Sequence, residues 1–170
     1  TALGTASLGV NTTGIYNTAL GFDSIANNTT GIYNTALGAL SLLDNTTGSS
    51  NIAIGPYSAF NGSVPLSTMT SSTFLGYGAN SSANAIGNST AIGAGSQVTK
   101  SNQVVIGDNN ITETLLNGSV GIGTSTAPAA RLDVNMANMA GNPIALALTD
   151  ASTQWYFATA RCTSCFASGA

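Results

Sequence analysis

Short hydrophobic groups, each closed by a glycine, recur along the first 123 residues of the chain. The groups read TAL, TAL, TAL, IAI, TFL, TAI, VVI and VGI. The closing glycines are Gly4, Gly21, Gly38, Gly55, Gly76, Gly93, Gly107 and Gly123, at intervals of 17, 17, 17, 21, 17, 14 and 16 residues. A nearly fixed interval of this length predicts one structural unit per repeat, with the units stacked on one another.

Each repeat has the pattern of a short strand and turns. Thr18 and Leu20 alternate with Ala19, which is the period of two expected for a strand. The motif Asn-Thr-Thr-Gly at 11–14, 28–31 and 45–48 supplies turns, because Gly and Asn tolerate positive φ. Gly and β-branched residues in every repeat disfavour a helix. We therefore expect two short strands and two turns per repeat, in a parallel β-solenoid with coils ~4.8 Å apart.

The residue before each glycine is expected to point into the roll. These residues form a predicted internal aliphatic ladder of seven coils: Leu20, Leu37, Ile54, Leu75, Ile92, Ile106 and Ile122. The alanines of the strands, Ala19, Ala36, Ala53 and Ala91, are then expected on the outer face. A thin roll with such a smooth, uncharged face would expose apolar surface as a monomer. Parallel threefold association about the long axis is the simplest closed way to cover that face.

Departures from the repeat predict the organisation of the rest of the chain. The longest interval contains NGSVPLSTMTSS at 61–72, and Pro65 cannot donate to a strand ladder, so a surface loop is expected there. After Gly123 the rhythm stops. The expected divisions are a roll over 1–123, a transition segment over 124–136, and the start of an incomplete second β module over 137–170. The chain opens in mid-pattern at Thr1, so we expect it to be a piece of a longer polypeptide.

The repeats resemble those of a known class of surface proteins. NTALG, NIAIG and STAIG, followed by a serine three residues after the glycine, are similar to the head repeats of trimeric autotransporter adhesins. The longer NTTGIYNTALG and the segment GSVGIGTSTAPAARLDV at 118–134 resemble phage tail fibres and bacterial surface proteins with an endosialidase-type chaperone. This resemblance implies an all-β, left-handed parallel β-roll wound as a homotrimer. It also implies an extracellular location, on a bacterial cell surface or a phage virion.

The composition of the chain limits which partners and which chemical activities can be expected. Charged residues are 5% of the chain and the net charge is −3, without the clustered Lys and Arg that nucleic acid or anionic lipid requires. No run approaches the ~20 apolar residues of a membrane span, so no direct membrane insertion is expected. There is no histidine, and the six acidic residues are scattered. We therefore expect no catalytic site, no metal and no cofactor, and hence no enzyme.

Two features near the C-terminus keep two interpretations each. Cys162 and Cys165 form a lone C-x-x-C, which fits either a local or intersubunit disulfide or two free thiols. Trp155 and Tyr156 fit either the core of a second β module or a carbohydrate-stacking platform.

Nine Asn-x-Ser/Thr sequons also occur along the chain. Either N-glycosylation or the abundance of Asn, Ser and Thr accounts for them.

These observations favour a structural and binding segment of a trimeric extracellular fibre. Its partners would be two further copies of itself and an unknown surface receptor or glycan, so that the fibre attaches to a host or another surface. The alternative is the subunit of a self-assembling extracellular filament, because the ends of a solenoid can continue the stack. A glycan-degrading tail spike is a third candidate, and it would need grooves lined by carboxylates and aromatic side chains.

Overall fold

The computed structural model describes residues 1–63, 66–122 and 132–134. The chain divides into two compact units, Thr1–Glu113 and Thr114–Ala170. Every regular element among the described residues is a β-strand, and every strand pair is parallel. These residues contain no helix that could cross a membrane. The prediction of an all-β parallel solenoid is confirmed.

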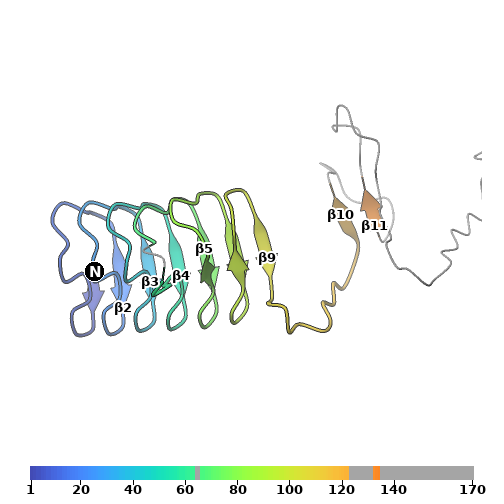
Figure 1. Cartoon of the computed structure of the whole chain (residues 1–170), viewed down its shortest axis with the longest axis horizontal. Coiled ribbons are helices and arrows are strands. Elements are labelled where there is room, and N and C mark those ends of the chain that lie inside the picture. Colours follow the sequence, from blue (N-terminus) through green and yellow to red (C-terminus); the bar gives the residue numbers. More distant parts are fainter. Residues whose placement is uncertain (64–65, 123–131, 135–170) are drawn as a thin grey trace, which may run out of the picture. The chain divides into compact units, whose positions relative to one another are not determined.

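The first unit is a stack of coils, each contributing one strand to a seven-stranded sheet (Figure 1). The strands, in sheet order, are β1 (Ala2–Leu3), β2 (Thr18–Leu20), β3 (Thr35–Leu37), β4 (Ile52–Ile54), β5 (Thr73–Leu75), β7 (Thr90–Ile92) and β9 (Val104–Ile106). The residue before each closing glycine pairs with its counterpart one coil away, as Leu20 does with Leu37. The repeat therefore sets the register, and seven stacked strands make six turns of the solenoid.

The seventh predicted coil does not join this stack. In the second unit, β10 (Val120–Ile122) pairs with β11 (Leu132–Val134), and Ile122 lies opposite Val134. The prediction that Ile122 extends the ladder is therefore wrong. Asn110 occupies the position that Ser96 holds one coil earlier, and its side chain and backbone N–H bond the carboxylate of Asp108. This local turn takes the place of the serine-to-glycine bond that Ser96 makes with Gly93.

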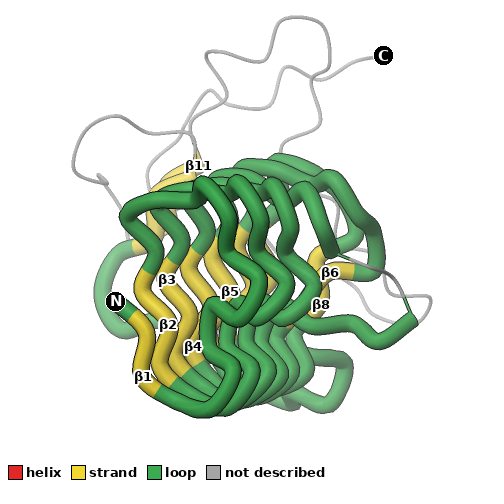
Figure 2. Tube along the Cα trace, turned by 90° about the vertical axis from the view of Figure 1, so that its left-hand side faces the viewer, coloured by secondary structure: helices red, strands yellow, loops and turns green. Residues whose placement is uncertain are grey.

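A second strand was expected in every coil and forms in two. It comprises β6 (Asn80–Ser81) and β8 (Gln97–Val98), which lie on the other side of the coil from the main sheet (Figure 2). In earlier coils this side contains residues in the left-handed region, such as Asp23 (φ 51°) and Ile25 (φ 49°). That conformation interrupts a strand, although the bonds between coils persist, as from Ile25 N–H to the Ser41 carbonyl (2.9 Å).

The alanines, and not the leucines, face the interior of the roll. The middle residue is fully buried or nearly so in the five inner strands β2, β3, β4, β5 and β7, as at Ala19, whereas Leu20 is 45% exposed and Leu75 is 42% exposed. The predicted ladder is in register but lies on the outer face, so the prediction of an internal ladder is wrong. Leu20, Leu37, Ile54, Leu75, Ile92 and Ile106 all occupy this outer position. The prediction that the alanines lie on the outer face is wrong for the same reason.

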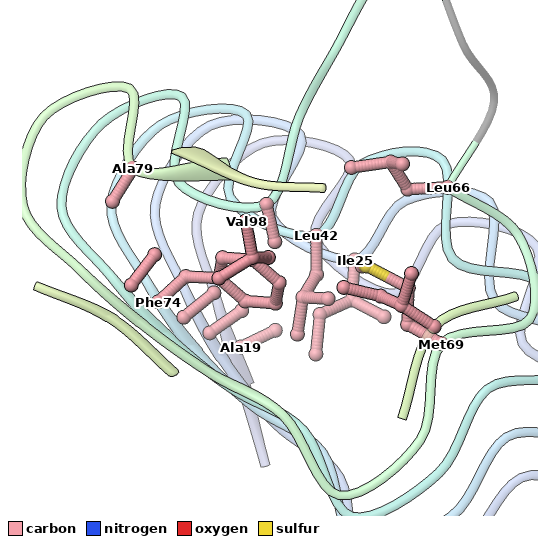
Figure 3. Close-up of a cluster of buried hydrophobic side chains, with 13 residues drawn as sticks. Ala19, Ile25, Leu42, Leu66, Met69, Phe74, Ala79 and Val98 are labelled. Atoms are coloured by element: carbon pink, nitrogen blue, oxygen red, sulfur yellow. The ribbon is translucent and has the colours of Figure 1, made fainter. Parts of the chain in front are cut away.

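The width of the coil explains this arrangement. Ile25 and Leu42 come from another side of the coil and, with Phe74, fill the space beside the alanine column (Figure 3). All three side chains are fully buried. With these large side chains inside, the strands can present only small residues inward at most coils. Interiors are close-packed, so a leucine at every alanine position would need a wider coil.

Two kinds of polar ladder run through the thin core. In the first, the backbone N–H of Asn34 donates to Oδ1 of Asn17 (2.9 Å), and that of Asn51 donates to Oδ1 of Asn34 (3.0 Å). In the second, serine hydroxyls donate to the carbonyl of the glycine three residues earlier, as Ser41 does to Gly38 (2.8 Å). The serine that recurs in the sequence is therefore an internal residue. These bonds satisfy backbone groups that a thin coil buries.

A further asparagine ladder ends at the irregular coil. Nδ2 of Asn28 donates to Oδ1 of Asn11, and Nδ2 of Asn45 donates to Oδ1 of Asn28 (3.2 Å). The next residue in register is Leu66, because Thr46 N–H bonds the Ser67 carbonyl as Thr29 N–H bonds that of Thr46. A leucine cannot donate to Asn45, and Oδ1 of Asn45 is buried without a hydrogen-bond partner.

The loop expected over 61–72 is shorter than predicted. Gly62 and Ser63 are exposed, and residues 64–65 lie outside the described residues. Leu66 and Met69, however, are fully buried, and Thr70 forms a parallel bridge with Ser49. The chain rejoins the coil at Leu66 because these two apolar side chains enter the core. The predicted loop is therefore wrong for 66–72.

The end of this ladder predicts a difference between two alanine variants. Asn28→Ala removes three side-chain hydrogen bonds, whereas Asn45→Ala removes two and also removes the unpaired oxygen. We expect Asn45→Ala to cost about 1 kcal/mol less in the free energy of unfolding than Asn28→Ala. Urea titrations of both variants at one protein concentration measure this difference. An equal or larger cost for Asn45→Ala would contradict the ladder.

Candidate functional site

The outward side chains of the main sheet form an uncharged surface, which we call the aliphatic face. One column contains the residue before each glycine: Leu3, Leu20, Leu37, Ile54, Leu75, Ile92 and Ile106. The second column contains Thr18, Thr35, Ile52, Thr73, Thr90 and Val104. Neither column contains a charged residue. Because the strands are in parallel register, each column is continuous across all coils of the stack.

Much of the aliphatic face is exposed in the single chain. Leu3 is 68% exposed, Val104 68% and Ile106 59%, and Leu37 is half-buried. At ~4.8 Å per coil, seven strands give a strip of aliphatic side chains about 29 Å long. Monomeric soluble proteins rarely expose apolar surface of this continuity, and such surface marks an interaction site.

A pair of tyrosines lies beside this face in the first coils. The rings of Tyr16 and Tyr33 are stacked, with centroids 4.9 Å apart and an interplanar angle of 10°. Both side chains are more than half exposed. They precede Thr18 and Thr35 by two residues, and Ser50 takes the equivalent position in the next coil. The pair is part of the repeat GIYN and extends the uncharged surface.

A second group, which we call the aromatic corner, consists of the exposed Tyr57 and Tyr77 and the half-buried Phe60. The rings of Tyr57 and Tyr77 meet edge to face with centroids 5.8 Å apart, and those of Tyr57 and Phe60 are 6.1 Å apart. Tyr57 is 40% exposed and Tyr77 is 63% exposed. The tyrosines follow Gly55 and Gly76, in the turns that leave β4 and β5.

Charged groups are few and separate in the described solenoid. A pocket of about 260 Å³ on the last coil is lined by Gly95, Gln97, Thr99, Val105, Gly107, Asp108 and Asn109. Hydrogen bonds from the side chain and backbone of Asn110 lower the pKa of Asp108 below its usual value. No second carboxylate lines this pocket, and the described residues hold no group of three His, Cys, Asp or Glu side chains. A glycosidase needs a pair of carboxyl groups, so this pocket does not provide that chemistry.

No protein-family model, curated protein or solved structure matches this chain. The surfaces of the solenoid are therefore what indicates its function. The aliphatic face has the chemistry of a buried interface, because it combines aliphatic side chains, regular spacing and no charge. The aromatic corner has a different chemistry, because it combines exposed phenol rings with a side-chain amide, that of Asn80, beside the backbone of Phe60.

Several predicted site residues cannot be compared with this geometry. Gly123, Trp155, Tyr156, Cys162 and Cys165 lie outside the described residues, and their roles stay predictions. The aromatic corner was not predicted. Its signal in the sequence was the position of Tyr57 and Phe60 inside the one long interval, between Gly55 and Gly76, at positions where no other coil has an aromatic residue.

Two of the nine sequons lie inside the roll. Asn28 and Asn45 are fully buried, and their amides belong to the ladder described above. A glycan on either amide would have no room and would remove a ladder donor. Glycosylation of these two residues is therefore incompatible with the folded coil.

The electrostatics of Asp44 give a pH-dependent prediction. Burial raises the pKa of the Asp44 carboxyl above its usual value, so the folded state favours the protonated form. Stability is then lost as the pH rises through the window between the ordinary and the raised pKa. Asp44→Asn should raise the melting temperature at pH 7 and leave it unchanged at a pH below both values. Thermal unfolding at the two pH values tests this, and equal stabilisation at both would contradict it.

Proposed function

We propose that this chain is a segment of a homotrimeric extracellular fibre, an adhesin or a phage tail fibre that attaches to a host or another surface. Three left-handed parallel rolls would associate side by side through the aliphatic face. The observation that carries this proposal is the continuous, uncharged aliphatic face, which the single chain leaves exposed or half-exposed at each coil. Burial of this face in the assembly would stabilise it by about 25 cal/mol for each Å² of apolar surface.

Parallel association follows from the register of the columns. Leu20, Leu37 and Ile54 recur once per coil, so chains in the same direction and register place like residues at equal heights. Rotation about an axis along the stack closes such an assembly and covers each chain equally. The number of three chains is what the resemblance of the repeats to adhesin heads implies. A roll that lengthens by one coil per repeat suits a fibre that holds a binding site away from its anchor.

Charges on the aliphatic face test this assembly. The double variant Leu37→Glu/Leu75→Glu changes two outward residues that the coil itself does not bury fully. We expect it to dissociate the trimer at micromolar concentration, because an unpaired charge in a buried interface is strongly unfavourable. Sedimentation velocity measures the change in mass.

The matched control adds the same charge elsewhere on the coils. Thr30→Glu/Thr47→Glu changes exposed turn residues, and this variant should keep the mass of the parent. If the variant with glutamates on the aliphatic face also kept the mass of the parent, the aliphatic face would not be the interface.

A further inference from the structure

We propose that the aromatic corner and the amides beside it bind a neutral carbohydrate chain. This inference builds on the proposed attachment role, and it gives that role a site and a ligand class. The corner lies on the turns that leave β4 and β5, where the otherwise regular repeat departs from its pattern. The ligand would lie along the roll, across adjacent coils.

The rings provide the apolar part of the site. Tyr57 and Tyr77 keep large exposed fractions although each has an aromatic neighbour within 6 Å. The residues equivalent to Tyr77 in other coils are Thr5, Phe22, Ala39, Pro56, Ala94 and Asp108, so the fold does not require a tyrosine there. Sugar rings present C–H groups on one face, and aromatic side chains bury such surface efficiently while the phenol oxygen stays available for hydrogen bonds.

A row of side-chain amides begins at Asn61, the residue after Phe60. Nδ2 of Asn61 donates to the Ser81 carbonyl (3.0 Å), and Nδ2 of Asn80 lies 3.5 Å from the Phe60 carbonyl. Nε2 of Gln97 donates to Oδ1 of Asn80 (3.1 Å). An amide has two N–H donors and two acceptor lone pairs on its oxygen, so each of these groups keeps capacity for further bonds. Paired donors and acceptors of this kind match the adjacent hydroxyl groups of a sugar.

The neighbourhood of the corner favours a neutral ligand over an acidic one. Neither the three aromatic residues nor the three amide residues are charged, and Lys100 is the one basic side chain of the described solenoid. Recognition of sialic acid, sulfate or phosphate groups would call for Arg or Lys at the site. The exposed insertion at Gly62 and Ser63 begins directly after Asn61, and a Cβ at Gly62 would stand 3.6 Å from Cζ of Phe60. Gly62 and Ser63 therefore form one border of the site.

The test uses the whole chain and defined probes. Hexasaccharides of glucose, mannose, galactose and N-acetylglucosamine, together with sialylated and sulfated glycans, are titrated by calorimetry. We expect at least one neutral hexasaccharide to bind, and Tyr57→Ala/Tyr77→Ala to weaken its binding by more than about tenfold. Asn80→Ala is a second variant that leaves the rings in place and should also weaken binding. Phe22→Ala, which removes an exposed aromatic side chain in the turn after β2, is the control and should bind as the parent does.

The result that overturns the inference is the absence of binding to every neutral probe, or binding that the Tyr57→Ala/Tyr77→Ala variant retains. Binding to the sialylated or sulfated probes alone would also overturn it. The mass of each sample is measured in the same experiment. A monomeric parent that binds the neutral probe through the corner would contradict the proposed trimer and support the binding site. A trimeric parent that binds no neutral probe would support the trimer and contradict the binding site.

Discussion

Gly38→Ala should disrupt the stack of coils. The backbone of Gly38 has φ of +136°, and a Cβ built there would stand 2.6 Å from the carbonyl carbon and oxygen of Gly55 in the next coil. Both the backbone conformation and the contact with a rigid neighbouring backbone disfavour any side chain. We expect a loss of about 3 kcal/mol or more in the free energy of unfolding. Urea and thermal unfolding, followed by circular dichroism, measure the loss.

Gly62 provides the control for this substitution. It lies in the exposed insertion, and the nearest atom to its added Cβ would be Cζ of Phe60 at 3.6 Å, an ordinary contact. Gly62→Ala should therefore change stability by less than about 0.5 kcal/mol. Comparable losses for the two variants would show that the glycines closing each strand are not held by the close approach of adjacent coils.

Asn34→Leu should have the second large effect. Oδ1 of Asn34 accepts from both the backbone N–H (3.0 Å) and Nδ2 (3.1 Å) of Asn51, and Nδ2 of Asn34 donates to the Gly48 carbonyl (2.8 Å). A leucine of similar size removes all three bonds and leaves the buried N–H of Asn51 without its acceptor. We expect a loss of about 2 kcal/mol or more in the free energy of unfolding, despite the greater hydrophobicity of leucine. Urea unfolding of the variant tests it.

A substitution at an exposed position is the control, because it shows whether a polar-to-apolar change alone lowers the free energy of unfolding. Thr30 is exposed in the adjoining turn, and Thr30→Val makes a similar polar-to-apolar change at the surface. This variant should unfold as the parent does. If Asn34→Leu were as stable as Thr30→Val, the internal asparagine ladder would contribute nothing to the fold.

The repeat in the sequence determined the class of fold and its register. The spacing of the glycines predicted a parallel solenoid, and it predicted which residues pair, as Leu20 with Leu37. It did not determine which face of the strand is inside. The alternation places Ala19 on one face of the strand and Thr18 and Leu20 on the other. It is equally compatible with either face pointing into the roll. The decision depends on the width of the coil, which Ile25 and Leu42 fill from another side.

The surfaces were harder to predict because they depend on contacts between coils. Tyr57 and Tyr77 are 20 residues apart and occupy different positions after their glycines, so the repeat alone does not bring them together. The polar interior was also missed. Asn17, Asn34 and Asn51 looked like turn residues in a chain rich in asparagine, and their role as an internal ladder depends on the register of the folded coils.

The mass of the unmodified chain in solution tests the central claim most directly. The chain has a mass of 16.8 kDa, and its aliphatic face is exposed unless other copies cover it. Sedimentation equilibrium at micromolar concentration should give three times the mass of the chain, with the strand signal of circular dichroism retained. A folded species with the mass of one chain would contradict the account, because the aliphatic face would then be stable in water without a partner.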